Sequence, residues 1–127
     1  MTAQIPKVTL PTPSVLHFFS GENGIDRTIY PDLDSFFTSL APIYRAEIAA
    51  LDADGCRYLQ LDEVPLALLC DSHIRERTKA RGPDPDWLIN LYIKAANDAL
   101  ADRLPDICVV MYRAAAITAA AGWLGRL

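Results

Sequence analysis

Two adjacent carboxylates, Asp62 and Glu63, follow directly after an apolar stretch that predicts a strand over Cys56–Leu61. Such a stretch is typical of a buried parallel strand, and binding or catalytic side chains commonly lie at the carboxyl ends of parallel strands. The two side chains are therefore the first candidates for a functional site. The alternative is that they cap the helix that follows, because carboxylates stabilise the positive end of a helix dipole. The strand by itself does not distinguish a functional site from a helix cap.

Two further strands are predicted, over Lys7–Leu10 and Asp106–Met111. The last is apolar throughout, as expected of a buried parallel strand. Helical segments separate the strands, and connections of this length allow right-handed crossovers, so a parallel sheet is expected. The sequence therefore predicts an α/β fold, as a doubly wound sheet or as part of a (β/α) barrel. A complete barrel needs about 250 residues, so this chain makes about half of one.

Helix signals lie between the strands. The first long helix begins at Asp32 or Asp34 and ends before Gly55, and Pro42 should bend or split it. The charged segment 71–81 is expected to form a solvated helix. The last helix begins at Pro85, and its apolar face is formed by Trp87, Leu88, Leu91, Tyr92, Ala95, Ala99 and Leu100.

The segment Pro11–Phe19 connects the first strand to the first long helix. Its closely spaced prolines, Pro11 and Pro13, should keep the backbone extended and rigid. His17 lies there among apolar residues, where a packed, hydrogen-bonded histidine is commoner than a catalytic one.

Composition limits the function further. Of 127 residues, 51% are hydrophobic, which predicts one globular domain, and the net charge of -4 argues against nucleic acid and anionic membranes as partners. No apolar run is long enough to span a bilayer, and the N-terminus lacks the order of charged and apolar residues of a signal peptide. Three widely spaced cysteines, Cys56, Cys70 and Cys108, form no CxxC pair and predict reduced, buried thiols in a cytoplasmic protein.

Three segments together carry a family resemblance: Lys7-Val8-Thr9-Leu10-Pro11-Thr12-Pro13-Ser14, Tyr44-Arg45-Ala46-Glu47-Ile48, and Gly55-Cys56-Arg57-Tyr58-Leu59-Gln60-Leu61-Asp62-Glu63. In this order they resemble the catalytic (β/α)8 domain of cobalamin-independent methionine synthases, in its shorter stand-alone form. The resemblance runs from about residue 6 to residue 111. It implies that residues 1–127 are a single partial domain that matches the middle of the family's barrel, with a divergent tail at 112–127. The alanine-rich composition of that tail predicts an added helix, because alanine favours helix.

The resemblance implies a chemistry. In the family, zinc binds the homocysteine sulfur, and the resulting thiolate takes the methyl group of 5-methyltetrahydrofolate in methionine biosynthesis. Asp62 matches the residue that would hold the amino group of homocysteine through a charge-assisted hydrogen bond. Glu63 matches the next motif position, in a supporting role, and His17 and Ser14 are expected to line the substrate mouth. The long synthases continue with proline after the second carboxylate, whereas here Val64 intervenes, so no contact beyond Glu63 is carried over.

The third strand departs from the family. There it leads into His-x-Cys, which supplies two zinc ligands, but here Tyr112 occupies the histidine position and Ala114 the cysteine position. Neither side chain is an ordinary zinc ligand. Cys56 and Cys108 are no substitutes, because neither has another histidine or cysteine at ligand spacing. We therefore expect this chain to bind no zinc and to be inactive alone.

The tail has an explanation in the genetic code. The short family form continues with Cys-Arg-Gly-Asn-Tyr-Arg-Ser-Gly-Trp after the third strand. When codons chosen for that motif are read one base later, they give Ala-Ala-Ala-Ile-Thr-Ala-Ala-Ala-Gly, which is the sequence of residues 114–122. The hypothesis is a frameshift near Arg113 that truncates a gene of this family. The alternative is an ordinary alanine-rich helix.

Three functions remain open. The first is the family's methyl transfer to homocysteine, of which this chain is an inactive fragment. The second is a small-molecule-binding module in which the carboxylates still hold an amino acid without chemistry. The third is a self-assembling fragment, because a half-barrel leaves open strand edges that can pair with another copy.

Overall fold

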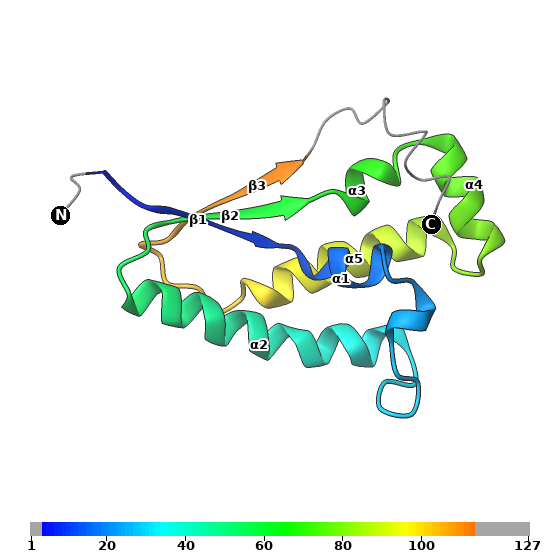
Figure 1. Cartoon of the computed structure of the whole chain (residues 1–127), viewed down its shortest axis with the longest axis horizontal. Coiled ribbons are helices and arrows are strands. Elements are labelled where there is room, and N and C mark those ends of the chain that lie inside the picture. Colours follow the sequence, from blue (N-terminus) through cyan, green and yellow to red (C-terminus); the bar gives the residue numbers. More distant parts are fainter. Residues whose placement is uncertain (1–3, 114–127) are drawn as a thin grey trace.

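The computed structural model describes residues 4–113, which form a mixed α/β fold around one sheet of three strands (Figure 1). In chain order the elements are β1 (Lys7–Pro11), α1 (Pro13–Phe18), the 3-10 turn η1 (Glu22–Gly24), α2 (Leu33–Ala53), β2 (Tyr58–Glu63), α3 (Pro65–Leu68), α4 (Ser72–Ala80), α5 (Pro85–Ala99) and β3 (Cys108–Arg113). The strands lie in the order β1-β2-β3, and both pairings are parallel. The predicted α/β class and parallel sheet are therefore confirmed. The expected alanine-rich helix falls outside the described residues.

Local signals place the ends of the long helices. Asp32 is the N-cap of α2, and its carboxylate accepts from the backbone N–H of Ser35, whose hydroxyl completes the capping box. Gly55, just past the C-cap of this helix, has a φ of 87°, which favours glycine. Asp84 caps α5, which has Pro85 in its first turn. These helix ends were predicted correctly.

Pro42 does not split α2, which runs unbroken from Leu33 to Ala53. A proline inside a helix costs about 3 kcal/mol, because a backbone hydrogen bond is lost and the ring crowds the preceding turn. Here its ring is exposed, while Phe37 and Ala41 before it and Ile48 after it are buried. Packing on both sides of Pro42 therefore holds the helix together.

The prediction that Pro11–Phe19 is extended is wrong, because α1 occupies most of it. Thr12 is the extended N-cap residue of this helix, and Pro13 occupies its first turn, where the missing N–H would have no partner. The helix turns Ser14 and His17, three residues apart, towards the interior, and both are buried.

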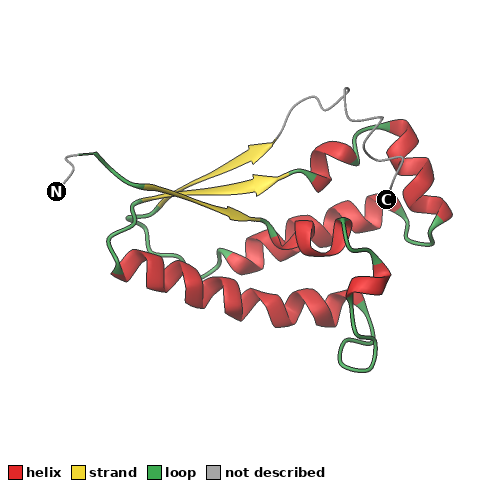
Figure 2. Cartoon of the chain, in the orientation of Figure 1, coloured by secondary structure: helices red, strands yellow, loops and turns green. Residues whose placement is uncertain are grey.

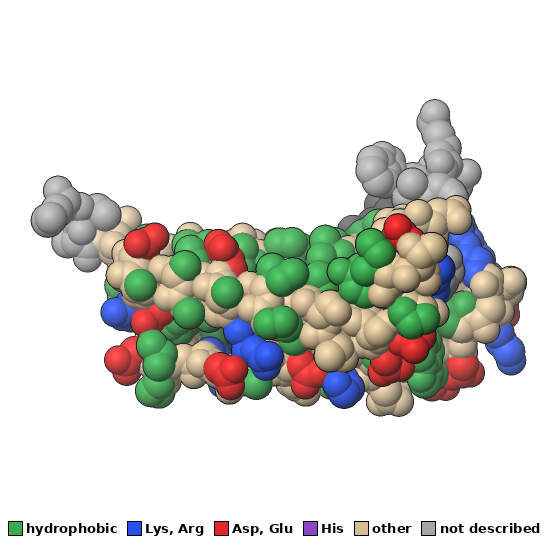
Figure 3. Space-filling model, turned by 90° about the horizontal axis from the view of Figure 1, so that it is seen from below, with side chains coloured by type: hydrophobic (Ala, Val, Ile, Leu, Met, Phe, Trp, Pro, Cys, Tyr) green, Lys and Arg blue, Asp and Glu red, His purple; other side chains and the backbone are tan. Residues whose placement is uncertain are grey.

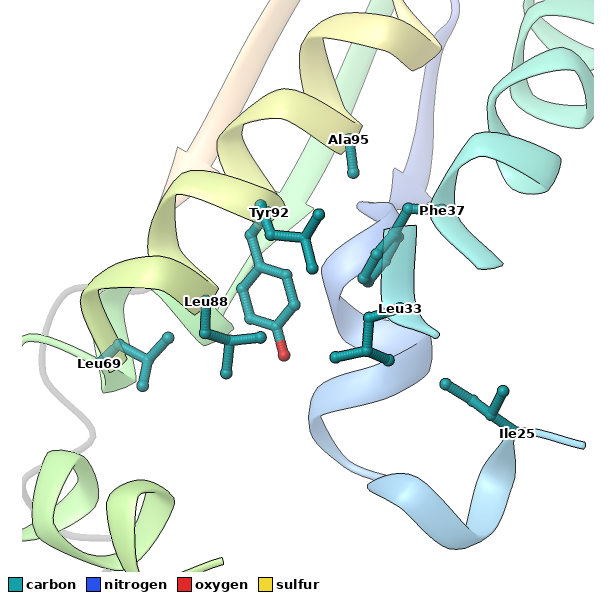
Figure 4. Packing of buried hydrophobic residues seen from close by; sticks show 8 residues of the cluster. Ile25, Leu33, Phe37, Leu69, Leu88, Tyr92 and Ala95 are labelled. Carbon is teal, nitrogen blue, oxygen red and sulfur yellow. The ribbon is translucent and has the colours of Figure 1, made fainter. Parts of the chain in front are cut away.

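Helices α2 and α5 lie on the same side of the sheet (Figures 1 and 2). Next to the strands, Ile48 of α2 packs with Leu59, Leu61 and Ile107 in one core cluster. A second cluster lies beyond the carboxyl ends of the strands, with Tyr92 of α5 among the side chains of α2 and α5 (Figure 4). Its buried members are Ile25, Leu33, Phe37, Leu69, Leu88, Leu91, Tyr92 and Ala95.

No described helix covers the opposite face of the sheet (Figure 2). Along β2 the buried residues Leu59, Leu61 and Glu63 alternate with the half-buried Tyr58, Gln60 and Asp62, which lie on this uncovered face. Strand β3, predicted to be buried, is an edge strand of the described sheet, and Met111 and Tyr112 are exposed by 42% and 58%. The apolar run of β3 therefore belongs to a parallel strand that has β2 on one side and no described strand on the other.

Other predictions of burial were wrong in part. Cys56 is buried, but Cys70 and Cys108 are exposed, and all three thiols are free. Trp87, placed on the buried face of α5, is 45% exposed, and the helix instead buries Ala96. The charged segment does form a helix, α4, with no buried residue. No helix within residues 4–113 has the length and apolar character needed to cross a membrane.

Candidate functional site

The carboxylate of Glu63 is fully buried and binds three elements together. Its Oε2 accepts hydrogen bonds from Thr12 Oγ1 at 2.7 Å and from Ser14 Oγ at 2.8 Å. Its Oε1 accepts from the backbone N–H of Leu66 in the first turn of α3, at 2.8 Å. The capping interpretation therefore holds for one oxygen of Glu63, while the other oxygen joins β2 to the beginning of α1.

The sequence folds this way because β1 and β2 end together. Pro11 lies opposite Asp62 in the parallel register, and the next residue, Thr12, donates its backbone N–H to the Asp62 carbonyl at 3.1 Å. The Thr12 hydroxyl also lies 3.2 Å from that carbonyl. Thr12 and Ser14 are 0% and 1% exposed, so the hydroxyl groups and the carboxylate satisfy one another without water.

Asp62 has the opposite environment, because successive residues of a strand point to opposite faces. It is half-buried on the uncovered face, between Pro11 and Tyr112 in the register. Its Oδ1 accepts from Gln60 Nε2 at 2.6 Å, and within residues 4–113 no hydrogen bond reaches Oδ2. An ionised carboxylate has about four acceptor positions, so Asp62 can still accept hydrogen bonds from a cationic ligand.

His17 lies apart from Asp62, on the buried side of α1. Its Nδ1 is 2.7 Å from the hydroxyl of Tyr92, and its ring packs edge-on against Phe37. Burial, with a smaller contribution from the positive charge of Arg27, lowers the pKa of His17 from 6.5 to about 4, so the imidazole is neutral at neutral pH. Burial and the nearby charge of Glu63 raise the pKa of Tyr92, which keeps its hydroxyl protonated.

The structure therefore divides the four predicted site residues. Ser14 and Glu63 meet in one buried network, Asp62 stands on the uncovered face, and His17 lines a cavity between α1, α4 and α5. The substrate-binding roles of all four stay predictions. Sequence reasoning missed three polar partners, Thr12, Gln60 and Tyr92. The only available signal was spacing, since Thr12 precedes Ser14 by two residues and Gln60 precedes Asp62 by two.

The residues of this region do not fit zinc. Among residues 4–113, no group of three or more His, Cys, Asp and Glu side chains could hold a metal ion. Tyr112, opposite Asp62 in the register, offers a phenol, which is not an ordinary zinc ligand, and Ala114 lies outside the described residues. Cys108 pairs with Tyr58, at the opposite end of β3 from Tyr112. No step of chemistry is therefore assigned to zinc here.

Comparisons with known proteins find two curated relatives, both in Bacillus subtilis (strain 168). The uncharacterized protein YxjH is 40% identical over 107 residues, and the uncharacterized protein YxjG is 37% identical over 108 residues. Each alignment covers 84% of this chain but 28% of the relative, so the chain spans little more than a quarter of the length of either protein. No family model matches the chain, and no solved structure matches it.

Proposed function

We propose that this chain is part of a (β/α)8 barrel of the cobalamin-independent methionine synthase type, and that its own contribution is to bind the ammonium group of homocysteine through Asp62. The observation that carries the proposal is the position of Asp62. It is the second-last residue of the central strand of a parallel sheet, and it lies on the uncovered face with acceptor capacity left on Oδ2. Active sites of (β/α)8 barrels lie at this end of the strands.

The arrangement of the helices supports a barrel over a doubly wound sheet. Consecutive strands are neighbours, and the long helices α2 and α5, one in each connection, lie on the same side of the sheet (Figure 1). A barrel has all its helices outside, whereas a doubly wound sheet has helices on both faces. The uncovered face would then be the barrel interior. YxjH is about 380 residues long, since 107 residues are 28% of it, and a complete barrel needs only about 250.

Binding without methyl transfer is the activity expected of this chain. An ammonium group at Asp62 would be held by a charge-assisted hydrogen bond on a half-buried carboxylate. Glu63 takes no part in that contact, because its two oxygens are already bonded to Thr12, Ser14 and Leu66. Its role in the proposal is to hold the beginning of α1 and the first turn of α3 at the end of β2.

Calorimetric titration of the full chain tests this proposal. L-Homocysteine is compared with 4-mercaptobutanoate, which keeps the thiol and the carboxylate but lacks the amino group. We expect homocysteine to bind at least about tenfold more tightly, since a hydrogen bond to a charged group contributes roughly 1.5–3 kcal/mol. Asp62→Asn should remove that preference, and Asp106→Asn, at an exposed loop carboxylate, should keep it. Equal affinity for the two compounds, or no binding of homocysteine, would contradict the proposal.

Self-assembly is the second candidate, and the edges of the sheet favour it. In the described part of the chain, neither β1 nor β3 has a partner on its outer side. Strand β1 carries Lys7 and Pro11, residues that discourage edge pairing, whereas the edge of β3 carries apolar residues from Val109 to Tyr112. A second copy would therefore add to the β3 edge.

A further inference from the structure

A cavity of about 100 Å³ opens to solvent, and Asp62 is not among the residues that line it. It lies between the end of α1, the outer helix α4 and the first turns of α5. None of the interactions described for Asp62 involves its walls. This cavity is therefore a second feature of the fold, with its own chemistry.

The walls of the cavity are mainly apolar. Phe18 and Phe19 line it from α1 and its end, Ile74 from α4, and Leu88 from α5. Phe19 is a large aromatic side chain that lines the cavity, yet 42% of its surface is exposed to solvent. A cavity with such walls favours a flat, apolar group over a strongly hydrated one.

The base of the cavity is polar but uncharged. His17 and Tyr92 both line it and are joined by the 2.7 Å contact between Nδ1 and the hydroxyl. Burial keeps the pKa of His17 low, at about 4, so this ring adds no positive charge at neutral pH. Any charge selection must therefore come from the other side chains of the cavity.

Those side chains are cationic. Arg77 and Arg81, four residues apart on one side of α4 and its C-cap, line the cavity together with Thr78, and no acidic residue is among its described lining residues. Although the chain has a net charge of -4, helix α4 and its C-cap carry four basic side chains, Arg75, Arg77, Lys79 and Arg81. Figure 3 shows Lys and Arg side chains at this end of the molecule as well as along the rest of the visible face. Arg75 is paired with Asp86 at 2.7 Å, whereas no ion pair joins Arg81 to a carboxylate within residues 4–113.

We infer that this cavity binds a small aromatic carboxylate, with its ring between the apolar walls and its carboxylate against Arg77 and Arg81. A guanidinium group matches a carboxylate in a planar, two-pronged contact. A buried cavity of about 150 Å³ holds benzene, so an open one of 100 Å³ can take a single ring whose charged group stays at the opening. This inference goes beyond homocysteine binding. The cavity and the proposed homocysteine site at Asp62 have no residue in common, so one proposal can fail while the other holds.

Titration of the full chain with benzoate and with benzamide, which has the same ring and shape without the charge, tests the inference. Benzoate should bind at least about tenfold more tightly than benzamide, as expected for contacts that depend on charge. Arg81→Gln and Arg77→Gln should each weaken benzoate binding by about five- to tenfold. Lys79→Gln removes the same charge from the same helix at an exposed position outside the cavity, and should change it less than about twofold.

Three outcomes would overturn the inference. The first is equal binding of benzoate and benzamide. The second is an effect of Lys79→Gln as large as that of the arginine variants, which would indicate only a general attraction of anions to α4. The third is binding of inorganic phosphate as tight as that of benzoate, because phosphate makes no use of the apolar walls.

Discussion

Asp62 and Glu63 are adjacent carboxylates with opposite environments. Glu63 points to the helix-covered side of the sheet, is fully buried and accepts three hydrogen bonds from Thr12, Ser14 and Leu66. Asp62 points to the uncovered side, is half-buried and accepts one, from Gln60. The alternation of a strand alone separates them. A pair that looks like one site in the sequence is thus a structural carboxylate beside a carboxylate that can still accept hydrogen bonds.

The largest expected difference between the two is in stability. Glu63→Ala leaves two buried hydroxyl groups and one half-buried N–H without their charged acceptor, and should lower the free energy of unfolding by about 3–5 kcal/mol. Asp62→Ala removes a side chain that joins no other element and should cost at most about 0.5–1 kcal/mol. Urea denaturation of both variants measures this. If the two variants lose equal stability, the division of roles is wrong.

The pH dependence of stability should show the same contrast between buried and exposed groups. The pKa of His17 is about 4 in the folded chain and 6.5 in the unfolded chain, so the unfolded state binds more protons between these values. Stability should therefore fall as the pH is lowered from 6.5 to 4, by up to about 3 kcal/mol from this residue. Denaturation at a series of pH values, in wild type and in His17→Phe, isolates its share.

The variant His17→Phe removes the buried imidazole and should flatten the slope of stability against pH between about 4 and 6.5. A slope that is the same in wild type and in His17→Phe would mean that the imidazole is not held neutral by burial.

The hydroxyl groups around Glu63 allow a finer test of the covered face. Thr12→Val and Ser14→Ala each remove one hydrogen bond to a buried carboxylate and should cost about 1–3 kcal/mol. Thr9→Val makes the same change as Thr12→Val, but at an exposed position of β1, and should stay within about 0.5 kcal/mol. Chemical denaturation compares the three. A loss for Thr9→Val as large as for Thr12→Val would show that strand position, not the network, sets the cost.

The features that could be predicted from the sequence are those set by residues close to one another along the chain. The N-cap Asp32, the Asp84-Pro85 start of α5 and the turn at Gly55 are set by neighbouring residues, and all were predicted. The parallel sheet followed from the lengths of the connections. The six-residue helix α1 was missed, because it is too short for an apolar period and Pro13 was interpreted as extended backbone rather than as a first helical residue.

The candidate site depended on longer-range contacts. Glu63 meets Thr12 and Ser14 across 51 and 49 residues of sequence, and no local pattern encodes that meeting. The position of Asp62 at a strand end was predictable, but its separation from His17 required the turn of α1 and the packing of Tyr92. The apolar character of β3 was interpreted as burial, whereas the described sheet ends at this strand.

The smallest expected effect concerns the uncovered face and the open edge of β3. If copies associate there, sedimentation velocity of the full chain should show a weight-average mass that rises with concentration. Val110→Lys places a charge on this half-buried edge strand and should weaken association by about tenfold, or about 1.4 kcal/mol. Ile43→Lys makes a comparable change on α2, at a residue that is 62% exposed, and should leave association unaltered. A wild-type chain that stays monomeric at all concentrations would remove self-assembly as a function and leave the uncovered face to binding alone.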